Sequence, residues 1–111
     1  MEIQELQHEG FVSLIPVGDL DANSSIAMDE KIQAQIDQQK FNIHIDCSGL
    51  EYISSAGLGV FISHMDELNE AGGKFVFSGM SDNVRKVFQL LGLEQLMTIV
   101  DTPSQAAEGF Q

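Results

Sequence analysis

Alternating strand and helix signals predict an α/β fold with the element order ββαβαβαβα. We expect a mixed sheet of about five strands, with helices mainly on one face. The chain has 111 residues, of which 43% are hydrophobic and 20% charged, as in ordinary soluble globular proteins. Because no repeat, low-complexity tract or Pro/Ser-rich linker divides it, residues 1–111 are expected to form a single domain.

The N-terminal segment predicts two paired strands. Phe11 to Val17 is a short apolar run closed by Gly18-Asp19, which indicates a strand that ends in a turn. Residues 1–7 alternate only weakly, and we expect them to pair with this run as a hairpin. Pro16 has no N–H to donate to a neighbouring strand, so it is expected at a strand end or on a sheet edge.

The rest of the chain alternates helix and strand. Helical spacing of apolar residues predicts helices that begin at Asn23 or Ser24, at Ser54 or Ser55, and after Ser81. The second of these helices is expected to end at the glycine pair 72–73, and the third at position 92. Strands are expected over residues 41–46, 74–78 and 97–100, and a terminal helical turn or two from Pro103.

Charge and cysteine content exclude several classes of function. Against 17 Asp plus Glu the chain has 5 Lys plus Arg, a net charge of -12, which disfavours direct binding to nucleic acid or to an anionic membrane surface. A basic protein partner is the easier expectation. One cysteine, Cys47, allows neither an internal disulfide nor a Cys-rich zinc site. With no signal peptide and no long apolar run, we expect a cytoplasmic protein without metal or cofactor.

The segment from Asp46 to Val60 has the most site-like chemistry. A strand is expected to end at Asp46, a loop to follow, and a helix to begin near Ser54 or Ser55. Free backbone N–H groups and the helix dipole favour an oxyanion there, and the small residues Ala56 and Gly57 would allow close approach. Alternatively, one of the serines is only a helix cap, worth about 1 kcal/mol.

The same segment resembles the STAS domain family, and within it the free-standing bacterial anti-sigma factor antagonists. The resemblance rests on Ser54-Ser55-Ala56-Gly57-Leu58-Gly59-Val60, on Asp46-x-Ser48 and on Gly18-Asp19-Leu20-Asp21. It covers essentially the whole chain, including the predicted order of elements.

This resemblance implies a phosphorylation switch. The serine two positions before the glycine of the motif, here Ser55, would be phosphorylated by the anti-sigma factor, a serine kinase that binds ATP. The unphosphorylated protein would bind that kinase and free a sigma factor, and a metal-dependent serine phosphatase would reset it. The residue before the phosphorylated serine is often Asp in the family. Here it is Ser54, whose hydroxyl makes it a rival acceptor of the phosphate. The implied partner-binding residues are Asp19, Asp21, Ser54, Ala56, Gly57 and Leu58.

Two alternatives remain open at this point. One keeps the STAS fold but makes the chain a subunit of a lipid-transport or stress-signalling complex. The other is a small hydrolase with Ser55 or Cys47 as nucleophile, which would need a nearby base. His44 is expected on the opposite strand face from Cys47, and the three histidines lack metal-ligand spacing. We therefore expect the chain not to be an enzyme.

Overall fold

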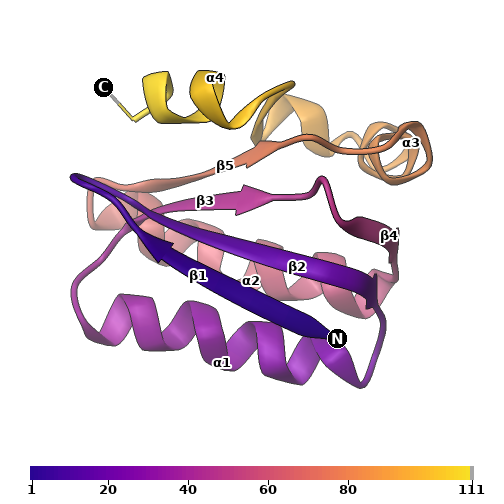
Figure 1. The fold of residues 1–111 in the computed structure, drawn as a ribbon, viewed down its shortest axis with the longest axis horizontal. Helices are drawn as coiled ribbons and strands as arrows, with labels where there is room; N and C mark the ends of the chain where they lie inside the picture. Colours follow the sequence, from indigo (N-terminus) through magenta and orange to yellow (C-terminus); the bar gives the residue numbers. More distant parts are fainter. Residues whose placement is uncertain (111) are drawn as a thin grey trace.

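In the computed structural model, which describes residues 1–110, the chain folds into a six-stranded mixed sheet with four α-helices (Figure 1). The elements follow one another as β1 (Glu2–Gln7), β2 (Val12–Leu20), α1 (Ser24–Asp37), β3 (Asn42–Asp46), β4 (Leu50–Ile53), α2 (Ser55–Glu70), β5 (Lys74–Ser78), α3 (Asp82–Leu90), the short 3-10 helix η1 (Leu93–Gln95), β6 (Thr98–Val100) and α4 (Pro103–Glu108). The predicted fold class is confirmed.

The strand order is β1-β2-β3-β5-β6, and β4 pairs separately with β2. The predicted hairpin is present, because β1 runs antiparallel to β2 from Glu2 opposite Val17 to Gln7 opposite Val12. All other pairs are parallel. The start of β2 pairs with β3, whereas its end, residues 18–20, pairs with β4. The carboxyl end of β2 therefore lies beside β4 and the start of α2.

Three local predictions were wrong. The strand expected to end in a turn at Gly18-Asp19 continues to Leu20. Residues 50–53 were expected to be a loop but form an additional strand, β4. The pairing of β2 with β3 ends at Leu14, and the free edge of β2 beyond it is filled by β4. Pro16, expected at a strand end or sheet edge, lies buried in the middle of β2. Its missing N–H is tolerated because Pro16 falls in the interval between the β3-paired and β4-paired parts of β2.

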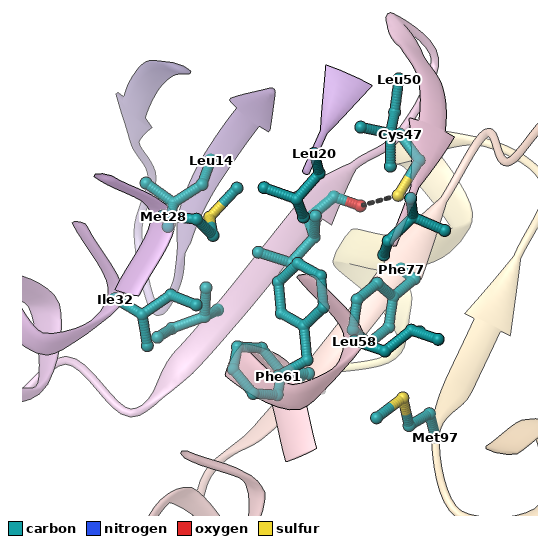
Figure 2. Packing of buried hydrophobic residues seen from close by; sticks show 14 of the residues in the cluster. Leu14, Leu20, Met28, Ile32, Cys47, Leu50, Leu58, Phe61, Phe77 and Met97 are labelled. Atoms are coloured by element: carbon teal, nitrogen blue, oxygen red, sulfur yellow. Dashed lines mark hydrogen bonds between the residues drawn. The ribbon is translucent and has the colours of Figure 1, made fainter. Parts of the chain in front are cut away.

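The two long helices cover one face of the sheet and form the core with it (Figure 1). Figure 2 shows Met28 and Ile32 of α1 and Phe61 of α2 converging on Leu14 and Phe77 of the sheet, all five of them fully buried. Helix α3 packs beside β4, while α4 lies over β3 and β5 on the opposite face. The predicted preference for one face thus holds for the two long helices.

Candidate functional site

The junction between β4 and α2 separates the two candidate serines. Ser54 has an extended backbone and caps α2: its Oγ accepts a hydrogen bond from the Gly57 N–H at 3.2 Å. Its own N–H donates to the Leu20 carbonyl at 2.9 Å, which fastens the junction to the end of β2. Ser55 is the first helical residue and is exposed, and its hydroxyl has no hydrogen-bond partner among residues 1–110. Ser55 is therefore the serine whose oxygen is free for chemistry.

Two residues of the motif face inward instead of toward a partner. A Cβ on Gly57 would lie 2.8 Å from Leu20 Cγ, so the molecule that approaches this glycine closely is the chain itself. Leu58 is 2% exposed and packs in the hydrophobic core (Figure 2). We therefore correct the expectation that Gly57 and Leu58 contact a partner, because neither offers a side chain to the surface. Ala56 is exposed beside Ser55.

Two carboxylates with different surroundings form an acidic turn region at the carboxyl end of β2, Asp19 within the strand and Asp21 just after it. Asp21 Oδ1 accepts hydrogen bonds from the N–H groups of Asn23 and Ser24, both at 3.0 Å. The Ser24 hydroxyl lies 2.8 Å from the Asp19 carbonyl oxygen and 3.1 Å from Asp21 Oδ1. The Ser24 N–H and then its hydroxyl lower the pKa of Asp21 below its ordinary value. The Asp19 carboxylate is exposed and has no such partner within the described residues.

The pairing of β2 with β4 brings the acidic turn and Ser55 to one edge of the sheet. In this pairing Asp19 is opposite Tyr52 and Leu20 is opposite Ile53, two residues before Ser55. The predicted residues Asp19, Asp21, Ser54, Ser55 and Ala56 thus lie around the carboxyl ends of two parallel strands. Sequence reasoning missed β4 and its exposed Tyr52, although Tyr52 is the single tyrosine of the chain.

Basic residues are absent from the parts of the chain that build this edge. The five Lys and Arg residues are at positions 31, 40, 74, 85 and 86, so residues 1–30 and 41–73 contain none. Arg85, on the neighbouring helix α3, is paired with Glu94 at 3.0 Å and with Asp101 at 3.5 Å. An anion added at Ser55 would therefore meet the start of helix α2 and a surrounding excess of carboxylates.

The other candidate nucleophile, Cys47, lacks the surroundings of a reactive thiol. Its side chain lies among the core residues (Figure 2) and is 1% exposed. Burial, reinforced by Asp46, raises the pKa of the thiol to about 12. The His44 ring is held on the opposite sheet face, with Nδ1 2.7 Å from Ser13 Oγ and Nε2 2.7 Å from Ser78 Oγ. Burial lowers the pKa of His44. Neither nitrogen is free to act as a base on Cys47.

The remaining histidines take part in surface and interhelix contacts. His64 Nε2 lies 2.6 Å from Asp29 Oδ1 and so joins α2 to α1, while His8 Nε2 lies 2.9 Å from Ser13 Oγ. Within residues 1–110 no group of three His, Cys, Asp or Glu side chains is arranged to hold a metal ion. Over the same residues, no helix has the length and hydropathy needed to cross a membrane.

Comparisons with known proteins point to one family. The model of the STAS domain matches residues 2–106. The anti-sigma-B factor antagonist of Staphylococcus epidermidis is 23% identical over 99 residues, which cover 89% of this chain and 92% of the relative. The anti-sigma factor antagonist SpoIIAA in its unphosphorylated form is 28% identical, with a TM-score of 0.83 over 96% of this chain and 94% of its own. The Bacillus SpoIIAA structure in the phosphorylated form is 26% identical, with a TM-score of 0.77 over 99% of this chain and 100% of the SpoIIAA chain.

Proposed function

Because the chain belongs to the STAS domain family, we propose that it is an anti-sigma factor antagonist switched by phosphorylation of Ser55. The observation that carries the proposal is the exposed, unpartnered Ser55 hydroxyl at the first position of α2. The unphosphorylated protein binds an anti-sigma factor, which is also its serine kinase, and so releases a sigma factor. A serine phosphatase restores the binding form. On this proposal the chain acts in the cytoplasm and has no catalytic role of its own.

The switch is electrostatic. A phosphate on Ser55 adds about 1.5 to 2 negative charges at pH 7 to an edge that already carries Asp19 and Asp21. Phosphorylation needs no rearrangement of the chain, since the hydroxyl is already exposed and a helix start tolerates a phosphate. The partner's surface, complementary to a small neutral hydroxyl, would then face a bulky anion. A 10²–10³-fold loss of binding corresponds to only about 3–4 kcal/mol.

The geometry favours Ser55 over Ser54 as the acceptor. The Ser54 oxygen is already the cap of α2, and modification would remove that hydrogen bond, at a loss of about 1 kcal/mol in stability. Ser55 has no such function in the fold. The relative SpoIIAA, which has been solved in both an unphosphorylated and a phosphorylated form, supports a modification of this kind.

The first test is intact-mass analysis with site mapping on protein purified from its native host, with and without phosphatase treatment. We expect one phosphatase-sensitive phosphate on Ser55. A phosphate on Ser54 would keep the switch and correct the acceptor. No phosphate under any growth condition would contradict the proposal and favour a subunit of a lipid-transport or stress-signalling complex.

The second test measures binding to the kinase. The kinase is first identified as the protein that Ser55→Ala retains from the native host, and it is then expressed alone for the binding measurement. Ser55→Ala should bind as tightly as the unphosphorylated wild type and accept no phosphate. Ser55→Asp should bind about 100-fold more weakly or worse, because one uncompensated charge would be buried in the interface. Ser54→Ala is the matched control, and it should still be phosphorylated. Equal binding by Ser55→Ala and Ser55→Asp would contradict the electrostatic mechanism.

A further inference from the structure

Tyr52 is unusual among the aromatic residues of this chain. The chain has one tyrosine, seven phenylalanines and no tryptophan. All seven phenylalanines are buried or half-buried, whereas the Tyr52 side chain is 53% exposed on β4. Its hydroxyl has no hydrogen-bond partner in the part of the chain that the structure describes. The fold therefore makes little use of this ring.

Tyr52 lies between the two parts of the candidate site. It is paired with Asp19 across β2 and β4, and three residues of chain, at most about 10 Å, separate it from Ser55. On the other side of Asp19, Val17 is 40% exposed. Val17 and Met1 line a shallow hollow of about 540 Å³ together with Asp19 and Asp21. Asp19 therefore belongs both to the strand pair that includes Tyr52 and to this hollow.

An exposed tyrosine beside carboxylates is more typical of a protein-binding surface than a single exposed apolar side chain is. Single exposed apolar side chains are common and need no explanation. Residues that dominate binding energy, however, are enriched in tyrosine and lie at the centre of an interface, with charged groups at the rim. Here Tyr52 is paired with Asp19, and no lysine or arginine occurs between positions 41 and 73. Such a surface is complementary to a basic one.

We propose that Tyr52 is the aromatic anchor of the surface that binds the anti-sigma factor. The partner would accept the ring in an apolar pocket with lysine or arginine residues beside it, which would meet Asp19. This inference rests on the function proposed above and extends it from the phosphorylated serine to the strand before it. The anchor supplies affinity in the unphosphorylated state, while Ser55 determines whether the two surfaces can close.

The test compares Tyr52→Ala and Tyr52→Phe for binding to the isolated anti-sigma factor. Loss of the ring should weaken binding about 30-fold or more, whereas Tyr52→Phe should stay within about threefold of wild type. Leu6→Ala is a matched control, since Leu6 is also 53% exposed but lies opposite Ser13, about 20 Å from Asp19 along β2. It should bind as wild type does. Thermal unfolding of each variant checks that the fold is intact. If Tyr52→Ala does not fold, Tyr52→Leu, which keeps apolar bulk without the ring, replaces it, and wild-type affinity of that variant would overturn the anchor.

The possible results separate this inference from the function on which it rests. If wild type fails to bind the anti-sigma factor, or Ser55→Asp binds as well as Ser55→Ala, the proposed function is wrong. If Ser55→Asp loses binding but folded Tyr52→Ala binds like wild type, only the anchor is wrong. Analytical sedimentation tests the alternative that a second copy of this chain, and not the anti-sigma factor, covers Tyr52. A wild-type dimer that Tyr52→Ala dissociates, with anti-sigma factor binding unchanged, would overturn the proposal.

Discussion

Asp21 organises the turn that presents Asp19. Its carboxylate accepts hydrogen bonds from the N–H groups of Asn23 and Ser24, whereas the Asp19 carboxylate has no hydrogen bond within residues 1–110. An asparagine can accept the same bonds, and alanine cannot. We therefore expect Asp21→Ala to lower the midpoint of thermal unfolding, Asp21→Asn to lower it less, and Asp19→Ala to leave it near the wild-type value.

The pH dependence of this effect has a definite sign. The pKa of Asp21 is lowered in the folded protein, chiefly by the Ser24 N–H. Its contribution to stability is therefore complete above the ordinary aspartate pKa of about 4 and is lost as the pH falls below it. The difference between wild type and Asp21→Ala should narrow in acid. A difference that does not change with pH, or an Asp21→Asn variant as unstable as Asp21→Ala, would contradict this role.

The residues of the site could be predicted from the sequence only in part. The serine pair at a helix start follows from local signals, since polar caps before an apolar helical stripe are visible in the chain. Which serine caps the helix depends on where β4 ends. Ser54 is held in the capping position by the hydrogen bond that its N–H donates to the Leu20 carbonyl. The inward direction of Gly57 and Leu58 likewise depends on how α2 lies on the sheet.

Strands and helices were predictable where their apolar spacing is regular. β3 alternates clearly, and α1 has buried residues at every fourth position, Met28, Ile32 and Ile36. β4 has only four residues, with Leu50 and Ile53 buried at its ends and two exposed residues between them. Such a pattern matches neither period, and pairing with the end of β2 alone makes the segment a strand.

The contact between α2 and β2 provides a matched pair of glycine substitutions. Gly57→Ala would place a Cβ 2.8 Å from Leu20 Cγ and 3.0 Å from the Leu20 carbonyl oxygen. We expect it to reduce the free energy of unfolding by about 1–3 kcal/mol. Gly59, in the same helix, has no atom within 4 Å of an added Cβ. Gly59→Ala should therefore raise the free energy of unfolding by about 0.5–1 kcal/mol, because alanine favours the helix.

Urea unfolding of both variants checks this comparison. Equal and small effects at the two positions would mean that α2 can shift away from Leu20 without loss. In that case the glycine of the motif would be free to serve a partner, as the sequence alone had suggested.

The surface around Ser55 is a product of the overall topology. Residues 17–21 and 50–56 are separated by about thirty positions, and the parallel pairing of β2 with β4 places them at one edge. The exposure of Tyr52 could not be predicted, because it depends on which side of β4 the sheet, α2 and α3 leave open. Composition did predict the excess of negative charge, and residues 1–30 and 41–73, which build this edge, contain no lysine or arginine.

The charge of the protein leads to a prediction about binding kinetics. With 17 acidic against 5 basic residues, long-range attraction to a basic partner should accelerate association. Salt shortens the range of this attraction, from about 10 Å at 0.1 M to about 3 Å at 1 M. The association rate of Ser55→Ala with the anti-sigma factor should fall about tenfold or more between 50 and 500 mM NaCl, while dissociation changes little. Asp19→Asn should show a flatter dependence. If salt leaves both rates unchanged, apolar contact around Tyr52 rather than charge would have to account for recognition.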